Sequence, residues 1–279
     1  MPAPSRARTD MPLRPVYAVL EREVVRMFRQ KARLVSAMVR PLIWLFVIGA
    51  GFGAVAHHAG GVDYQQFLLP GILGMTALFG AMLAALTVVY DKESGVMRML
   101  IIAPFAHYWI IVAKTLAAAL AGLIQCVLLL VLLAVLSRLD SSVNFVLLIF
   151  GLIVTALACA GIGMIVATFT RTLDNFAAIM NFVIFPVFFL SGSLYPVSRL
   201  PATLKAVALA NPYTYGVDLL KHAVLGVLPS GMGADFAMST DIAVLLGFTA
   251  AALLIASWRF SRESAYEPMI RILTGKRDG

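Results

Sequence analysis

Few side chains in this sequence are arranged as catalytic or metal-binding groups usually are. The only Gly-Lys pair, Gly275-Lys276, lacks the rest of the G-x-x-x-x-G-K-[ST] phosphate-binding pattern, and no nucleophile elbow, H-E-x-x-H or C-x-x-C motif is present. The adjacent His57 and His58 could ligate a metal, but two histidines without further ligands support a metal site only weakly. We interpret them as residues of a solvated loop, so the sequence predicts neither a catalytic residue nor a metal site.

The remaining polar candidates stand in or beside long apolar runs. Acidic residues fall in loops or at the edges of these runs: Asp63, Asp91, Asp174, Asp218 and Asp241. An ion-coupled carrier usually needs an acid inside the membrane or a helix broken at its midplane, and the sequence shows neither clearly. Gln125, Thr155 and Asn181 lie within apolar runs. We favour hydrogen bonds between helices for these three, with a place along a substrate path as the alternative.

The composition explains why few residues are arranged as catalytic or metal-binding groups. Of the 279 residues, 61% are apolar and 13% are charged, and the mean hydropathy is +0.92. Soluble domains are nearer half apolar and a quarter charged. An ordinary cytosolic enzyme, a disordered chain and a disulfide scaffold are therefore excluded, and an integral membrane protein remains. Cys126 and Cys159 lie deep in apolar runs, where we interpret them as small buried side chains.

Six apolar runs are long enough, or nearly so, for a helix to cross about 30 Å of hydrocarbon, which takes about 20 residues. They cover residues 39–55, 67–90, 109–136, 143–169, 176–194 and 242–258. The runs are apolar on every face and do not alternate, which favours helices over a barrel. We predict an all-α, six-transmembrane-helix bundle over residues 39–258, with polar segments at 1–38 and 259–279.

The basic residues predict an orientation for this bundle. If the N-terminus is inside, 18 of the 22 Lys and Arg residues lie in or beside the cytoplasmic segments. The other four are Arg138, Arg199, Lys205 and Lys221. Because Lys and Arg favour cytoplasmic loops, both termini are predicted to be cytoplasmic. The net charge of +8 is thereby a topology signal, and no nucleic-acid partner is predicted.

Residues 15–36 are too charged to cross a membrane, yet they carry an apolar stripe. Val16, Leu20, Val24, Met27 and Phe28 recur at helical spacing, followed by Leu34 and Val35. Basic residues supply much of the polar remainder. We predict an amphipathic helix that lies on the cytoplasmic leaflet, in preference to a separate binding function.

The segment 91–108 (DKESGVMRMLIIAPFAHY) joins the second and third predicted spans. Asp91 to Glu93 end the second span, Gly95 permits a sharp turn, and residues 96–102 could form one or two amphipathic turns before Pro104. A short helix held between two spans could act as a lever. A plain solvated turn is an equally good interpretation of the residues alone.

The segment 191–240 is irregular and lies on the predicted outer side. Ser191-Gly192 and Tyr195-Pro196 break the fifth span, and two apolar pieces follow at 201–209 and 213–225. Both are too short to span and too apolar to be solvated freely, so we predict a re-entrant helical hairpin. Asn211-Pro212 predicts a helix start, with Asn as the N-cap and Pro at the first helical position.

These segments together resemble the type-2 ABC exporter permeases, a family that includes nodulation-factor, drug and polysaccharide exporters. Residues 91–100 with Ala103-Pro104 are similar to the family's cytoplasmic loop, E-x-G-(x)n-R-L-L-x-x-P, which leads to a Lys, here Lys114. The outer break at Ser191-Gly192 and the stretch 211–218 (NPYTYGVD) are similar to the family's outer segments. Lys221 stands near where relatives often carry Arg. The likeness extends over about residues 15–260.

The resemblance implies a permease subunit of an ATP-driven exporter, without a nucleotide site of its own. Such permeases pair into a twelve-span homo- or heterodimer in the bacterial inner membrane and bind two ATPase subunits, which carry ATP and Mg. The coupling helix that docks on the ATPase would include Glu93, Gly95, Val96, Arg98, Leu100 and Pro104. The substrate path would be lined by Phe46, Asn181, Phe182, Phe185, Phe188 and Phe189, although the fifth-span phenylalanines could equally face lipid. The outer hairpin would be organised by Tyr195, Pro196, Asn211, Pro212, Asp218 and Lys221.

A second interpretation is a membrane-embedded enzyme or assembly factor that acts on lipid-linked substrates. It would need polar catalytic groups clustered at one membrane face. The scattered His57, His58, Asp63 and Asp218 are poor candidates.

Overall fold

The computed structural model describes residues 13–29, 39–49, 51, 64–97, 108–136, 143–225 and 233–274, and every regular element among them is helical, which confirms the all-α prediction. The helices are α1 (Leu13–Arg29), η1 (Trp44–Ile48), α4 (Tyr64–Glu93), α6 (Tyr108–Val135), α7 (Phe145–Phe169), α8 (Leu173–Phe189), η3 (Val197–Arg199), α9 (Ala202–Ala210), α10 (Pro212–Val224) and α11 (Met238–Thr274).

Four helices are long and apolar enough to cross a membrane: α4, α6, α7 and the part of α11 from Met238 to Arg262. Two apolar helices are shorter, Val39–Ile48 and α8. The helix at the fifth apolar run has 17 residues; it begins before the predicted run of 176–194 and ends at Phe189, before the run does. The first run is helical over 39–49, and residues 50 and 52–55 lie outside the described part.

The last helix is longer than its apolar run. α11 continues to Thr274, through most of the segment 259–279 that hydropathy assigns to a polar tail. Hydropathy detects the part of a helix that suits hydrocarbon, and it does not detect where the backbone hydrogen bonds end. A charged helical extension is therefore invisible to it.

The core is built around α4, which packs against α6, α7, α8 and α10. An unbroken run of its residues, from Phe67 to Met82, is buried. Small residues let the neighbours approach closely: a Cβ added at Gly122 of α6 would lie 2.8 Å from the Ala77 carbonyl oxygen. Such close contacts between small residues are typical of helix pairs in membranes.

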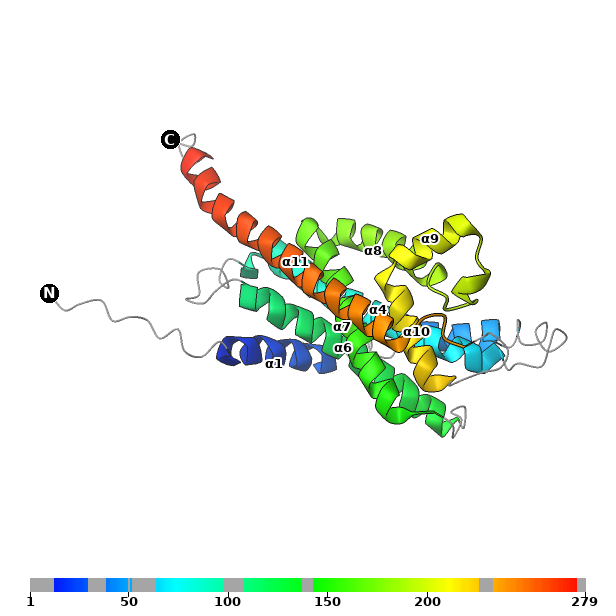
Figure 1. Ribbon diagram of the computed structural model, residues 1–279. Coiled ribbons are helices and arrows are strands. Elements are labelled where there is room, and N and C mark those ends of the chain that lie inside the picture. Colours follow the sequence, from blue (N-terminus) through cyan, green and yellow to red (C-terminus); the bar gives the residue numbers. More distant parts are fainter. Residues whose placement is uncertain are drawn as a thin grey trace.

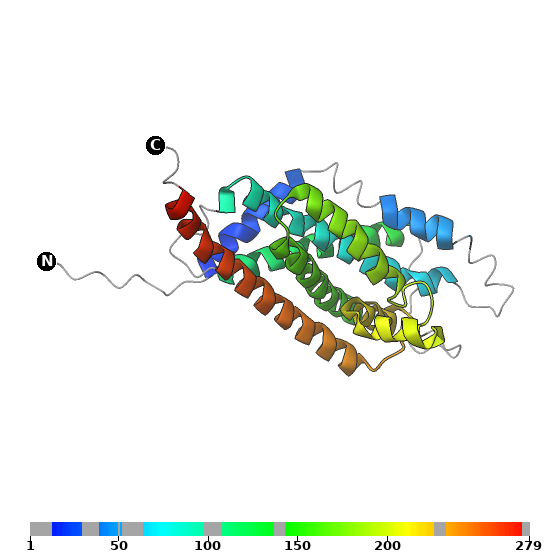
Figure 2. The same cartoon turned by 90° about the horizontal axis from the view of Figure 1, so that it is seen from above.

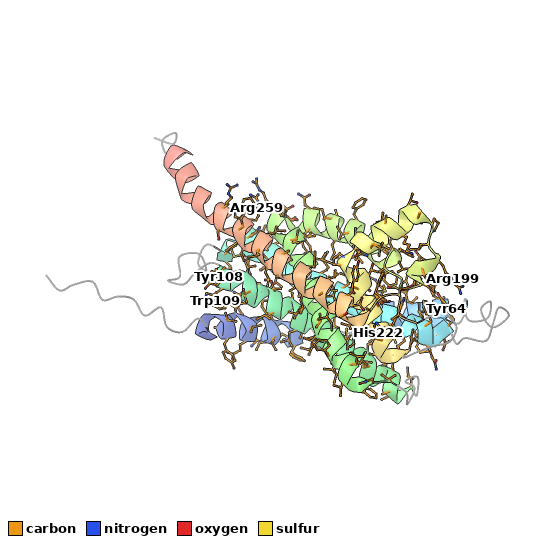
Figure 3. The ribbon with its side chains drawn as sticks, viewed as in Figure 1. Tyr64, Tyr108, Trp109, Arg199, His222 and Arg259 are labelled. Carbon is orange, nitrogen blue, oxygen red and sulfur yellow. The ribbon has the colours of Figure 1, made fainter. Side chains whose placement is uncertain are left out.

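The bundle has two different ends, which position the residues discussed below. Figure 1 shows α1 and the C-terminal part of α11 at one end and α9 and α10 at the other. Figure 2 gives the same arrangement from above, and in both views α8 forms an outer layer. Tyr108 and Trp109 mark the first end, and Tyr64, Arg199 and His222 mark the second (Figure 3). We call these the α1 end and the α10 end.

Candidate functional site

The described part of the predicted coupling helix begins where α4 ends at the α1 end. The Ser94 amide still donates to the Tyr90 carbonyl oxygen, at 2.9 Å, and Gly95 then turns the chain. Gly95 has a φ of 76°, in the left-handed region where a side chain is strained. Helical geometry resumes at Val96 and Met97. The predicted turn at Gly95 is confirmed, whereas Arg98, Leu100 and Pro104 lie outside the described residues.

The last residues of α4 join the ends of two other helices. Lys92 Nζ donates to the carbonyl oxygens of Thr168 (2.9 Å) and Ala167 (3.3 Å), in the last turn of α7. Glu93 Oε2 accepts a hydrogen bond of 3.1 Å from the amide of Leu173, the first residue of α8. A cation at a helix C-terminus and an anion at a helix N-terminus both complement the helix dipole. Two adjacent side chains thus connect the start of the predicted coupling helix to α7 and α8.

A buried ion cluster lies close to this junction. Lys114 Nζ of α6 is 2.5 Å from Asp91 Oδ2 and 2.6 Å from Glu23 Oε1, and its side chain is 1% exposed. Arg22 adds contacts of 2.9 Å to the same two carboxylates. Two cations thus face two anions, so the buried charges are compensated. Although burial disfavours its charged form, contact with Lys114 and Arg22 holds the pKa of Glu23 below its usual value.

This cluster attaches α1 to the bundle. Val16 and Val19 of α1 pack with Ala113, beside Trp109, on α6, and Glu23 lies on the same stripe, four residues after Val19. The predicted amphipathic helix of 15–36 is present as far as Arg29, residues 30–36 lie outside the described part, and one face of the helix packs on α6. Phe28, which the periodicity places on the apolar face, is exposed. An acidic residue that continues an apolar stripe is the signal that could have identified the cluster.

The substrate-path candidates on α8 divide between two faces. Phe182, Phe185, Phe189 and Asn181 lie on the exposed face, and Phe182 is 80% exposed. Phe188 is 2% exposed and packs on Trp44 with ring centroids 5.3 Å apart. Phe188 therefore joins α8 to the first apolar helix and does not lie on the open face. Phe46, on that first helix, is exposed.

After α8 the helix ends and the chain turns where the sequence predicts it. Gly192 has a φ of 77°, and the Tyr195 hydroxyl donates to the carbonyl oxygen of Phe189, which ties the turn to the end of α8. Pro196 then precedes η3. These contacts fold the chain back toward α9.

Several side chains of the stretch NPYTYGVD (211–218) make hydrogen bonds that connect α10 to neighbouring helices. Asn211 Oδ1 caps α10 by accepting from the Tyr213 amide at 3.1 Å, and its Nδ2 donates to the Val187 carbonyl oxygen of α8 at 2.7 Å. The hydroxyls of Thr214 and Tyr215 donate to the carbonyl oxygens of Ala208 and Leu209 at the end of α9. The predicted N-cap, with Pro212 at the first position, is confirmed.

The charged residues of α10 hold the loop that leads into α11. Both Asp218 oxygens accept backbone hydrogen bonds, from Asp235 (2.7 Å) and Phe236 (2.9 Å). Lys221 Nζ is 3.2 Å from Asp235 Oδ2, and the Asp235 carboxylate accepts from the Val197 and Ser198 amides of η3. Burial raises the pKa of Asp218 even though these hydrogen bonds and Lys221 favour its charged form. Asp235 was not among the predicted residues, because nothing in its local sequence marks it.

One polar residue predicted within a span makes the expected contact. Thr155 of α7 donates to the Gly216 carbonyl oxygen of α10 at 3.3 Å, which is a hydrogen bond between helices. Asn181 instead lies on the exposed face of α8, and a place along a substrate path stays a prediction for it.

The family profile described as ABC-2 type transporter matches residues 14–225. Nodulation protein J of Rhizobium leguminosarum bv. trifolii is 28% identical over 208 residues, which cover 70% of this chain and 75% of the relative. The putative transport permease ycf38 of Cyanophora paradoxa is 23% identical over 210 residues, 74% of this chain and 72% of the relative. The probable multidrug ABC transporter permease YbhR of Escherichia coli (strain K12) is 24% identical over 166 residues, which cover 59% of this chain and 45% of the relative. The matched region includes the end of α4, the ion cluster and all of α10, and the chain therefore belongs to the ABC-2 type transporter family as a multi-pass permease subunit.

Proposed function

We propose that this permease is half of a dimeric exporter in which two ATPase subunits act on residues 91–104 and the open face of α8 borders the substrate path. A permease of this family carries no nucleotide-binding domain, so ATP and Mg belong to a partner ATPase. The dimer, the two ATPase copies and the outward direction are the parts that we propose.

The proposed orientation places the α1 end in the cytoplasm of a bacterium with both termini inside. The helix α1, which carries Arg22, Arg26 and Arg29, and the C-terminal part of α11, which carries Arg259 and Arg262, lie at this end (Figure 1). Arg199, Lys205 and Lys221 lie at the α10 end. The excess of basic side chains at the α1 end supports this orientation. It requires that Val39–Ile48 and α8, with the residues that flank them, also cross the membrane, which makes six spans.

The open face of α8 supports a role at a dimer interface or along a path. Phe182, Phe185 and Phe189 expose aromatic surface, and Asn181 exposes an amide beside them. Hydrocarbon alone offers an amide no hydrogen-bond partner, which disfavours a face in contact with lipid only. Aromatic rings with one polar group suit an amphiphilic substrate or a second copy of α8.

The observation that carries the proposal is the link from the end of α4 to α7 and α8. A displacement of the segment after Glu93 would be transmitted to the N-terminus of α8 by the Glu93 carboxylate. It would be transmitted to the C-terminus of α7 by Lys92. Because α8 packs on the first apolar helix through Phe188 and Trp44, its tilting would change the face where the path is proposed. Closure of the ATPases could thus move the path without bending a helix.

Co-purification tests this proposal. The tagged chain is extracted in mild detergent, its partners are identified by mass spectrometry, and vanadate-sensitive ATP hydrolysis is measured. We expect an ATP-binding subunit in equal amount. Gly95→Pro should leave insertion and assembly intact but uncouple hydrolysis from transport, because proline cannot adopt the positive φ of Gly95. Recovery of the chain without any ATP-binding subunit, or full transport by Gly95→Pro, would contradict the coupling assignment.

A further inference from the structure

The α10 end contains a buried cluster that neither the transport proposal nor the hairpin contacts explain. Asp218 and His222 of α10 and Asp241 of α11 each place one ligand-type atom within 4.8 Å of the others. His222 Nε2 is 3.6 Å from Asp241 Oδ2. Two carboxylates and an imidazole at this spacing form a donor set that suits divalent transition metals.

Asp241 is the independent observation that points to a ligand. Its side chain is completely buried, and neither carboxylate oxygen accepts a hydrogen bond from any residue that the structure describes. A buried carboxylate that lacks hydrogen bonds is strongly disfavoured. Asp241 lies in the first turn of α11, where the helix dipole offsets only about half a charge.

The charges of the surrounding residues also leave room for a cation. Three carboxylates meet here, Asp218, Asp235 and Asp241, and the one ammonium group among the described neighbours is that of Lys221. Lys221 is 3.2 Å from Asp235 and 3.8 Å from Asp218. When all three carboxylates are ionised and the imidazole is neutral, two negative charges remain uncompensated. One divalent cation would balance them.

We propose that Asp218, His222 and Asp241 bind a divalent transition-metal ion that fastens α10 to the start of α11. Asp218 is already oriented by its two backbone hydrogen bonds. His222 Nε2 would exchange its contact with the Phe236 carbonyl oxygen, 3.0 Å away, for the metal. The imidazole ligand favours Zn²⁺ over Mg²⁺ and Ca²⁺, which prefer oxygen ligands. Without the metal, the polar contacts between α10 and the residues that lead into α11 are those of Asp218, Lys221 and His222 with Asp235 and Phe236.

The test uses the full-length protein in a background in which His57, His58 and His107 are changed to alanine, so that His222 is the only histidine, and with a tag that contains no histidine. The protein is stripped with EDTA, Zn²⁺ is added, and bound metal is counted by mass spectrometry after gel filtration. We expect about one Zn²⁺ per chain, a visible absorption band when Co²⁺ replaces Zn²⁺, and a higher melting temperature with either metal.

Two variants make the result specific. Asp241→Asn and His222→Gln should each weaken Zn²⁺ binding at least tenfold and remove the metal-dependent rise in melting temperature. His222 is partly exposed, so His222→Gln provides a folded comparison if Asp241→Asn does not fold. Absence of bound Zn²⁺ in the single-histidine protein, or equal binding by His222→Gln, would overturn the proposal. So would an Asp241→Asn protein that is more stable than its parent and indifferent to metal, because a protonated Asp241 would then account for the burial.

Discussion

Single side chains at helix ends attach α10 to its neighbours, and Asn211 makes contacts in two directions. Its Oδ1 caps α10, and its Nδ2 reaches the Val187 carbonyl oxygen near the end of α8. The cap could be predicted from Asn-Pro alone, since an N-cap is a local pattern. The bond to α8 could not, because it depends on how two helices pack that are separated by η3 and α9.

Replacement of Asn211 separates these two contributions. Asn211→Ala should lower the free energy of unfolding by about 2 kcal/mol, because it removes a cap worth about 0.5–2 kcal/mol and leaves a carbonyl oxygen unpaired. Asn211→Ser keeps a capping oxygen but is too short to reach Val187, so it should lose about half as much. Thermal unfolding in one detergent compares the two. Equal losses for Ser and Ala would show that the cap contributes nothing.

The ion cluster at the α1 end is the second feature set by single residues. Lys114 has two carboxylate neighbours that are far from it in sequence, Glu23 and Asp91. A family resemblance can mark Lys114, but the sequence does not reveal these partners, since their meeting requires α1, α4 and α6 to be in place. The buried charges make the cluster sensitive to loss of one member.

Lys114→Met should destabilise the protein by about 3–5 kcal/mol, because two buried carboxylates would then share only Arg22. A second change, Glu23→Gln, should recover part of the loss by removing one of those charges. Lys205→Met is a matched control, since Lys205 lies exposed on α9. The test compares the melting temperatures of the parent, Lys114→Met, the double variant and Lys205→Met. A Lys114→Met protein as stable as Lys205→Met would contradict the role assigned to the cluster.

Among whole elements, α8 differs from the expectation for a transmembrane helix. It is short, contains Pro186, and is held at its first turn by Glu93 and at its last by Asn211. Hydropathy locates the apolar run but not the helix ends, because Ser191 and Gly192 interrupt the helix inside a stretch that is still apolar. The contacts at its two ends, more than its own length, therefore fix α8.

If the first of these contacts transmits motion, Lys92→Met with Glu93→Gln should reduce substrate-stimulated ATP hydrolysis severalfold while the permease still co-purifies with its ATPase. The double change removes the cation from the end of α7 and weakens the acceptor at the start of α8. Ser94→Ala is the control, because its hydroxyl bonds only within α4. Unchanged stimulation in the double variant, with Ser94→Ala also normal, would show that α4 does not drive α7 and α8 through these side chains.

On the scale of the whole molecule, the distribution of charge predicts an orientation, whereas helix length alone does not predict the number of crossings. The described helices include four of spanning length and two shorter ones. The orientation remains a prediction, and the rule behind it needs only counts of Lys and Arg in the loops. The crossing of α8 depends on where the membrane boundaries lie relative to its caps, which composition does not determine.

Three single-cysteine proteins test the orientation and the crossing of α8 together, in a background with Cys126 and Cys159 changed to alanine. Cysteines replace the exposed Ser94, Arg171 and Lys205, which lie before α6, between α7 and α8, and on α9. A membrane-impermeant maleimide should label only Lys205→Cys in intact cells and all three after permeabilisation, because α6 and α7 cross in a pair and α8 crosses once more. The opposite pattern would reverse the orientation. Protection of all three in intact cells would mean that α8 does not cross, and the link from Glu93 to α8 would then act within one face of the membrane.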